Sequence, residues 1–210
     1  MNDTLVFQHI YSNTEAAGWT ALAVPRLIRY CHAYSMDFQY IQADPPHYHY
    51  REHNIGHWAI PYYLREFMGM GYNKIIYIDH DCILADMNAD FRDACKENFI
   101  GAVWHDRALS DPTAESHYND GALYVSNTAR VRMFVDDWLA EFPGGEPWFE
   151  QGVFNRLGGE RNIINRIDDR WNSGYINRSL RPVVIGLHGM PYRGGRVKEK
   201  ILELEAQESQ

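Results

Sequence analysis

The sequence predicts an α/β fold, with a single domain in which helices cover both faces of a mainly parallel sheet. Segments typical of strands and helices alternate over the first 80 residues, which is the order that produces parallel sheets. A chain of 210 residues has the size of one substantial domain. Its hydrophobic content of 45% is enough to form a core without disulfides or a structural metal.

The first half of the chain carries strand and helix signals in turn. The predicted elements are a strand at residues 5–10, a helix at 15–35, a strand at 37–42, a helix at 53–70 and a strand at 74–78. Leu22, Ile28 and Cys31 recur at helical spacing in the first helix. Pro25 must lie in the first turns of that helix or kink it, and Gly69 ends the second helix. Ligands of such a sheet bind beyond the carboxyl ends of its strands.

The second half of the chain is more mixed. We expect strands at 99–104, 122–126, 162–167 and 183–187, with helices near 86–96, 128–142 and 148–157. The domain is expected to cover residues 1–196. The charged segment 197–210 would be a solvated helix, a disordered end or the start of a linker to a further domain.

Composition narrows the set of partners. The formal net charge of −8 and the pI near 5.6 argue against binding to nucleic acid or anionic lipid, because both need clustered cations. Small molecules or neutral glycans are the expected partners. Cys31, Cys82 and Cys95 contain no CxxC pair, so they predict neither a disulfide framework nor a zinc knuckle. We found no apolar stretch of the ~20 residues that a membrane span needs and no signal sequence, and we therefore expect a soluble cytoplasmic protein.

The segment Asp79-His80-Asp81 follows the apolar strand at 74–78. Two carboxylates spaced two residues apart at the end of a strand project to the same side. At an effective dielectric near 20 and a separation of roughly 5 Å, they repel by about 3 kcal/mol, and a divalent cation reverses that repulsion. Oxygen ligands suit Mg²⁺ or Mn²⁺, which bind diphosphate oxygens in turn.

This segment resembles the DxD motif of the GT-A glycosyltransferases, which also follows an apolar strand. The resemblance implies a GT-A, Rossmann-like domain and a nucleotide-sugar donor. It also implies that Asp81 is a direct metal ligand, that Asp79 binds the ribose and the metal, and that His80 lies against the donor. The implied cation is Mn²⁺ or Mg²⁺, and the implied donor is a UDP-hexose.

Two downstream segments support the resemblance. Asn119-Asp120-Gly121 is similar to the family's N-x-G strand, in which a polar pair faces the donor sugar; the alternative is a strand entered through an Asn-Asp-Gly turn. Glu150-Gln151 is similar to the E/D-Q pair of retaining galactosyl-, mannosyl- and xylosyltransferases, which lies near the anomeric carbon and the acceptor. The alternative for Glu150 is a favourable charge in a first helical turn. The expected catalytic residues are Asp120, Glu150 and Gln151.

The end of the chain carries a third set of resemblances. In the family an apolar strand ends in a His that completes the metal shell and a Gly that lets the backbone reach the diphosphate; His188 and Gly189 match this pattern. Arg193 and Arg196 would contact phosphate, although this segment could also be an ordinary exposed loop. The segment 168–172 resembles the family's aromatic-Asn pair, with Trp171 expected in the core. The chain lacks the membrane anchor of Golgi members, which favours a bacterial or viral enzyme.

The expected function is the metal-dependent transfer of a hexose from a nucleotide sugar to a glycan or another hydroxyl acceptor, with retention favoured over inversion. One alternative is a haloacid-dehalogenase-like phosphatase with Asp79 as nucleophile. That class needs a lysine between its later motifs to hold the phosphoryl charge, and this sequence has no lysine at the corresponding place. Another is a non-catalytic nucleotide-sugar-binding module. His47, His49, His53 and His57 lack an HExxH glutamate, so we expect them to line the donor or acceptor pocket rather than to bind zinc.

Overall fold

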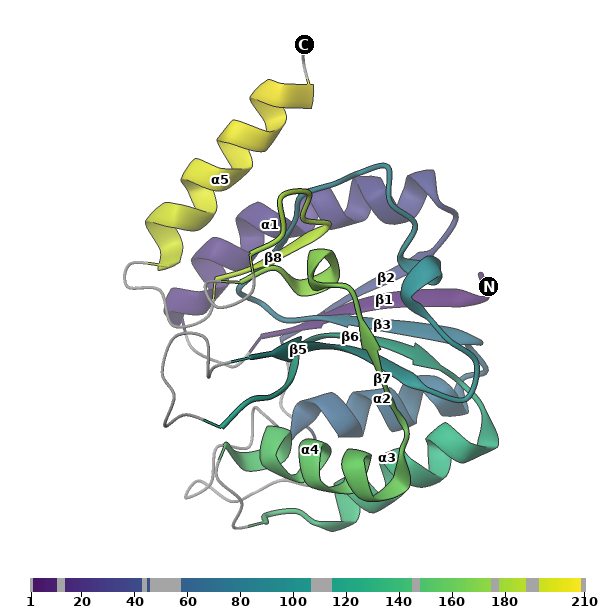
Figure 1. The fold of residues 1–210 in the computed structure, drawn as a ribbon. Helices are drawn as coiled ribbons and strands as arrows, with labels where there is room; N and C mark the ends of the chain where they lie inside the picture. The colour runs from purple at the N-terminus through teal and green to yellow at the C-terminus, as the bar shows by residue number, and fades with distance from the viewer. Residues whose placement is uncertain are drawn as a thin grey trace.

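The computed structural model describes residues 2–10, 14–42, 45, 58–106, 115–144, 148–174, 178–187 and 193–208, apart from the side chains of 11–21, 188–197 and 208. A central sheet separates two layers of helices (Figure 1). One face is covered by α1 (Thr14–Ala33), with α5 (Arg193–Glu208) beyond it. The other face is covered by α2 (Ala59–Gly69), α3 (Ala129–Ala140) and α4 (Phe149–Arg161).

The main sheet has six strands in the order β2-β1-β3-β6-β5-β7. The strands are β1 (Thr4–His9), β2 (Asp37–Ile41), β3 (Lys74–Ile78), β5 (Ile100–His105), β6 (His117–Ser126) and β7 (Ile164–Ile167). The pairs β1·β2, β1·β3 and β5·β7 are parallel, and β6 is antiparallel to both of its neighbours. The start of β6 therefore lies at the same edge as the carboxyl ends of the other strands. The expected mainly parallel sheet with helices on both faces is confirmed.

Alternation along the buried strands divides the core in two. In β1, Leu5 and Phe7 belong to the cluster shared with α2, α3 and α4, whereas Val6 belongs to the cluster on the α1 side. The same alternation places Ile75 of β3 in the first cluster and Ile76 in the second. Successive strand side chains point to opposite faces, so a strand that is covered on both faces is apolar throughout. This requirement explains the uninterrupted apolar runs that mark the central strands in the sequence.

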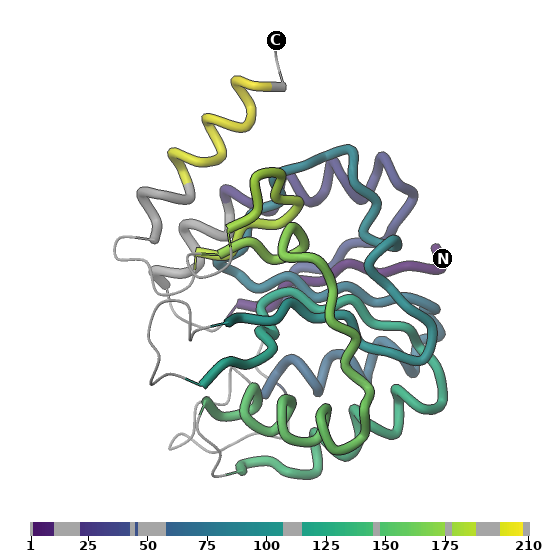
Figure 2. Tube along the Cα trace, in the orientation of Figure 1, coloured from purple at the N-terminus to yellow at the C-terminus, as the bar shows by residue number. Residues whose placement is uncertain are grey.

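A second, two-stranded sheet lies beside the first. It pairs β4 (Cys82–Leu84) with β8 (Val184–Gly186) in an antiparallel register, with Cys82 opposite Gly186. The tube in Figure 2 follows the chain from α4 through β7 to β8 on the opposite side of the main sheet. Segments about 100 residues apart in sequence therefore meet directly after the predicted DxD motif.

The terminal helix α5 is partly buried. It begins at Arg193, before the expected boundary at residue 197. Its Ile201 and Leu204 pack in a small cluster with Ala23 of α1 and with Ile83 and Leu187. The described part of this segment is helical, and one side of the helix is packed rather than solvated, because these apolar residues recur at helical spacing.

Several predicted boundaries differ from the structure. The helix expected at 86–96 is only a short 3-10 helix, η1 (Phe91–Ala94); the Asp90 carboxylate accepts from the Arg92 backbone N–H at 2.8 Å and forms a 2.6 Å ion pair with its guanidinium. Such local side-chain bonding competes with a regular helix. The helix expected from residue 53 begins at Ala59 within the described residues. Strand β4 was not predicted, because its three residues are too few for a periodic signal.

The first helix also differs in detail from its prediction. Pro25 lies in the interior of α1 rather than in its first turns. Leu22 and Ile28 are exposed, and the buried side of the helix is formed instead by residues that include Leu27 and Tyr30. Helical spacing alone identified the helix but not the side that packs against the sheet.

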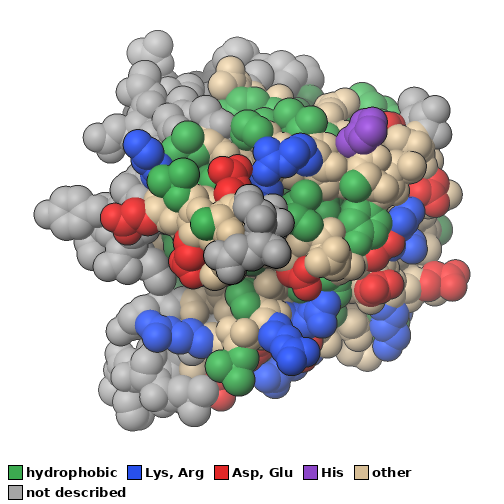
Figure 3. Space-filling view, turned by 90° about the horizontal axis from the view of Figure 1, so that it is seen from above, with side chains coloured by type: hydrophobic (Ala, Val, Ile, Leu, Met, Phe, Trp, Pro, Cys, Tyr) green, Lys and Arg blue, Asp and Glu red, His purple; other side chains and the backbone are tan. Residues whose placement is uncertain are grey.

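The surface mixes charge types. On the face shown in Figure 3, basic and acidic side chains are interspersed with hydrophobic ones. Among the described residues, no helix is both long enough and apolar enough to span a membrane.

Candidate active site

Asp79, His80 and Asp81 form a tight turn between β3 and β4. The Cys82 backbone N–H donates to the Asp79 carbonyl oxygen at 3.0 Å, which closes the turn. Gln8 at the end of β1 donates from Nε2 to the same oxygen at 2.9 Å, and the Asp79 N–H donates to the Gly121 carbonyl at 2.7 Å. The expectation that both carboxylates project to one side was based on strand alternation. That argument does not apply here, because the residues are in a turn and not in extended backbone.

The two aspartates differ in environment. Asp79 Oδ1 accepts from the Tyr77 hydroxyl at 3.2 Å and from the His80 backbone N–H at 2.7 Å. The His80 ring nitrogen Nδ1 lies 2.7 Å from the same oxygen. The Asp79 side chain is 23% exposed, whereas Asp81 is only 2% exposed. His80 therefore orients the Asp79 carboxylate, and Asp81 lies deeper in the protein.

The Asn119-Asp120-Gly121 segment belongs to β6 itself. Asn119 is paired with Val103 of β5, so the alternative of a turn before the strand is wrong. Asn119 Oδ1 accepts from the Gly121 N–H at 3.0 Å and from Asn172 Nδ2 at 2.6 Å. Asn119 Nδ2 donates to Gln151 Oε1 at 3.3 Å. A single amide side chain thus connects three of the segments singled out in the sequence.

The first turn of α4 is held against β6. Gln151 Oε1 also accepts from the Asp120 backbone N–H at 3.3 Å. One turn further on, Asn155 pairs with the backbone of Tyr118, accepting from its N–H at 2.7 Å and donating to its carbonyl at 2.9 Å. Gly158 allows α4 to approach β7, because a Cβ at this position would collide with the Ile164 side chain. These contacts fix Glu150 and Gln151 beside the start of β6.

Three carboxylates come together at this point. Asp120 is 7% exposed and Glu150 is 2% exposed. Burial, and then the charges of Glu150 and Asp79, raise the pKa of the Asp120 carboxyl well above its usual range. Within the described ranges, Asp120 Oδ2 has no hydrogen-bond partner. The carboxyl of Asp120 therefore favours a bound proton, a cation or a ligand hydroxyl.

The end of β8 is bonded to the DxD turn. The Leu187 N–H donates to the Asp81 carbonyl oxygen at 3.0 Å, extending the ladder between β4 and β8 by one residue. Leu187 immediately precedes His188 in the chain. Several residues assigned to the site in the sequence lie outside the described part of the structure, namely His188, Gly189, the side chains of Arg193 and Arg196, and His47, His49, His53 and His57. Within the described part, no group of three His, Cys, Asp or Glu residues is arranged to hold a metal ion.

An aromatic pair precedes Glu150. Trp148 and Phe149 are each 40% exposed and have φ values of 66° and 53°, a conformation that costs L-residues about 1–2 kcal/mol. The Trp148 ring lies 4.5 Å from the ring of His117, at the start of β6. The sequence analysis did not assign a role to either aromatic residue. An unusual backbone with exposed rings beside the carboxylates is typical of a ligand contact.

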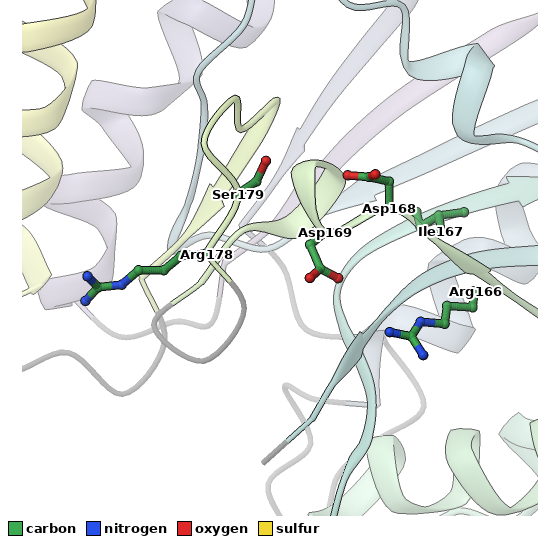
Figure 4. A pocket seen from close by; sticks show the side chains of 6 residues that line it. All are labelled: Arg166, Ile167, Asp168, Asp169, Arg178 and Ser179. Atoms are coloured by element: carbon green, nitrogen blue, oxygen red, sulfur yellow. The ribbon is translucent and has the colours of Figure 1, made fainter. Parts of the chain in front are cut away.

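A cavity of about 390 Å³ lies at the carboxyl end of β7 (Figure 4). It is lined by Arg166, Ile167, Asp168, Asp169, Arg178 and Ser179. Arg166 and Ile167 come from β7, Asp169 from the 3-10 helix η3 (Asp169–Asn172), and Arg178 and Ser179 from the segment before β8. In the view of Figure 4 the Asp169 carboxylate lies between the guanidiniums of Arg166 and Arg178. Trp171, as expected, is buried in the core.

The fold is that of GT-A-like glycosyltransferases. The solved structures that it resembles include a glycosyltransferase involved in the glycosylation of the major capsid of PBCV-1, with a TM-score of 0.69 and 12% identity over 97% of this chain and 98% of the other. A second is the apo structure of the bifunctional glycosyltransferase WbbM, with a TM-score of 0.62, 11% identity and coverage of 97% and 51%. A third is GlyE of Streptococcus pneumoniae TIGR4, with a TM-score of 0.58, 14% identity and coverage of 98% and 63%.

The extent of these matches differs. The chain spans nearly the whole length of the PBCV-1 enzyme, about half of WbbM and somewhat less than two thirds of GlyE. No protein-family model and no curated protein matches the sequence. At such low identity the resemblance concerns the fold, and function must be argued from the residues of the site.

Proposed function

We propose that this protein is a metal-dependent glycosyltransferase that transfers a hexose from a nucleotide diphosphate sugar, with UDP as the favoured nucleotide, to a hydroxyl acceptor. The observation that carries the proposal is the bonding of separate motifs to one another at the carboxyl edge of the sheet. Asp79 is bonded to Gly121, Asn119 to both Gln151 and Asn172, and Asp81 to Leu187. A chance DxD in a loop has no reason to contact the other motifs of the family.

The donor would bind over the DxD turn and the start of β6. Asp79, whose side chain is 23% exposed, would contact the ribose and the diphosphate together with its neighbour His80. Gly121 lies directly beside Asp79 and Asn119 is bonded to Gly121, so both would face the donor sugar. Gly189, Arg193 and Arg196 follow β8 in the sequence and are proposed to contact the phosphates.

The proposed cation is Mn²⁺ or Mg²⁺, held by Asp79, Asp81 and His188. Carboxylate oxygens suit these ions, and imidazole is an acceptable ligand for Mn²⁺. The Leu187–Asp81 hydrogen bond supports the assignment of His188, because the Cα atoms of adjacent residues are only about 3.8 Å apart. When bound, the cation would neutralise charge on the departing nucleotide diphosphate.

In the proposed transfer, the acceptor oxygen forms a bond to the anomeric carbon as the bond from that carbon to the diphosphate oxygen breaks. We favour attack on the face from which the diphosphate leaves, which retains configuration and allows the acceptor proton to pass to a phosphate oxygen. Gln151 would position the sugar, because it is fixed by Asn119 and Asp120. Glu150 would stabilise positive charge that develops at the anomeric carbon, and the Asp120 carboxyl, which favours a bound proton, would hydrogen-bond to a hydroxyl of the sugar.

Turnover separates this proposal from its two alternatives. The purified protein is incubated with Mn²⁺ and a panel of UDP- and GDP-hexoses, and release of nucleotide diphosphate is measured. Slow hydrolysis of one donor that stops on adding EDTA is expected of a transferase without its acceptor. Hydrolysis of p-nitrophenyl phosphate instead would indicate a phosphatase. Saturable binding of a nucleotide sugar without either reaction would indicate a binding module, and both of these results would contradict the proposal.

A further inference from the structure

The cavity beside η3 has the chemistry of a sugar site. Arg166 and Asp169 both line it and carry opposite charges, yet within the described part of the chain they form no ion pair with each other. The carboxylate can accept hydrogen bonds and the guanidinium can only donate them. A sugar hydroxyl does both, so neighbouring hydroxyls of one ring can satisfy the two side chains together.

The charge of the cavity matches a neutral ligand. Its lining contains two arginines and two aspartates, so the formal charges cancel. Asp168 is partly engaged, because its Oδ1 caps η3 by accepting from the Arg170 N–H at 2.9 Å. Among the described residues of the lining, Ile167 is the only hydrophobic one. A lipid tail or an apolar aglycone would find almost no apolar surface here, whereas a polar ring would find donors and acceptors on several sides.

The volume of the cavity indicates that its ligand is a small sugar unit. At about 390 Å³ the cavity lies toward the lower end of the range for small-molecule sites, roughly 300–1,000 Å³. A monosaccharide or disaccharide end fits such a space.

The sheet places the cavity next to the donor residues. Ile167 of β7 is opposite Val103 of β5, and Val103 is opposite Asn119 of β6. Two strand spacings therefore separate the cavity wall from Asn119, roughly 10 Å. In addition, Asn172 at the end of η3 donates to Asn119 at 2.6 Å. The segment that carries Asp169 is thus bonded to the residue proposed to face the donor sugar.

We propose that this cavity is the acceptor subsite and that it takes the neutral hexose end of a saccharide, with Asp169 accepting from one hydroxyl while Arg166 and Arg178 donate to its neighbours. This inference rests on the proposed function, because an acceptor exists only if a sugar is transferred. It adds the class of acceptor and the residues that select it, none of which is part of the DxD, N-x-G or Glu-Gln segments.

The test compares two cavity variants with two matched controls. Asp169→Asn and Arg166→Gln keep the size of each side chain and remove its charge. Asp136→Asn on α3 and Arg181→Gln are exposed and do not line the cavity. Methyl β-D-glucoside, galactoside and mannoside, together with methyl β-D-glucuronide, are used as probes. Binding is measured by saturation-transfer NMR titration in the presence of Mn²⁺ and UDP, and hydrolysis of the nucleotide sugar is measured without acceptor.

The proposal predicts that at least one neutral hexoside binds, that its Kd rises tenfold or more in both cavity variants, and that neither control changes it. Hydrolysis of the nucleotide sugar should stay within about twofold of wild type in the two control variants. Equal Kd values in wild type and cavity variants, no binding of any hexoside, or tighter binding of the glucuronide would each overturn the subsite. If a hexoside binds as expected but no nucleotide sugar is hydrolysed, the proposed transfer fails while the sugar site remains.

Discussion

The Asn172 side-chain amide donates a 2.6 Å hydrogen bond to Asn119 Oδ1, although the two residues are 53 positions apart. Asn172 is fully buried. The bond connects η3, which forms one wall of the cavity, to β6. Strand β6 carries the residues that are proposed to bind the sugar donor. The Nδ2 group of the same Asn119 amide donates to Gln151 on α4. The proposed donor and acceptor positions are therefore connected through one strand residue.

Removing that bond should weaken both fold and activity. We expect Asn172→Ala to lower the free energy of unfolding by about 1–3 kcal/mol, because Asn119 Oδ1 loses one of its two donors and a fully buried amide is removed. Urea denaturation measures this change, and transfer activity should fall with it because η3 is released. Ser179→Ala, which lines the cavity but lies outside this bond, is the control. Unchanged stability in Asn172→Ala would show that the Asn119 contact is dispensable.

The negative charge of the Asp120 carboxylate should destabilise the folded, ligand-free protein. Because its pKa is raised by burial and by Glu150, we expect Asp120→Asn to raise the melting temperature near pH 7, while activity is lost. The Asp120 carboxyl stays protonated to a higher pH in the folded state than in the unfolded state. Wild-type stability should therefore fall relative to the variant as pH rises from about 4, the unfolded pKa, through the raised folded pKa.

Thermal unfolding of both proteins between pH 3 and pH 8 measures this difference. The two melting temperatures should agree at the acidic end, where the carboxyl is protonated in both states, and separate as pH rises. A constant difference across the whole range would indicate that the charge of Asp120 is not the cause.

Trp148 should matter more for activity than for stability. The ring is 40% exposed and its backbone has a positive φ, so Trp148→Gly relieves strain while it removes the aromatic surface. We expect the melting temperature to change by only a few degrees and kcat/KM to fall about tenfold or more, as expected for the loss of a stacking contact. Met133→Ala, an exposed apolar residue of α3, is the control. Full activity in Trp148→Gly would contradict a ligand contact.

Arg26 should be needed to hold β4 in place. It is buried in α1 and donates from Nε to the Leu84 carbonyl at 2.6 Å and from its guanidinium to the Ala85 carbonyl at 3.1 Å. Arg26→Met should cost about 3 kcal/mol or more, because one buried and one part-buried carbonyl lose a charged donor. Exposed Arg29 on the same helix, changed to Met, should cost less than about 1 kcal/mol. Chemical denaturation of the two variants distinguishes these outcomes.

The sequence was most informative where the pattern is long or the chemistry is specific. Strand β3 and the helices α1 and α3 were predicted close to their bounds, because buried strands and amphipathic helices leave strong periodic signals. The relation of Asn119 to Gln151 was anticipated only through a family resemblance. Its hydrogen bonds depend on the strand order β3-β6-β5, which no local pattern encodes.

Other features left no signal that sequence analysis could use. The β4·β8 sheet joins strands of three residues each, and the cavity collects Arg166, Asp169 and Arg178 from three separate segments. The helix predicted around Asp90 is instead a short 3-10 helix, whose first residues are capped by the Asp90 side chain. Each of these outcomes depends on tertiary contacts or local geometry rather than on periodicity.

The central claim is that Asp81 belongs to a cation site that holds a nucleotide diphosphate. The most direct test is calorimetric titration of UDP into wild type, Asp81→Asn and the exposed control Asp93→Asn, each with and without Mn²⁺. We predict binding that requires Mn²⁺ in wild type and in Asp93→Asn, and a loss of at least a hundredfold in affinity in Asp81→Asn, with circular dichroism unchanged. Equal UDP binding with and without Mn²⁺, or undiminished binding in Asp81→Asn, would contradict the claim.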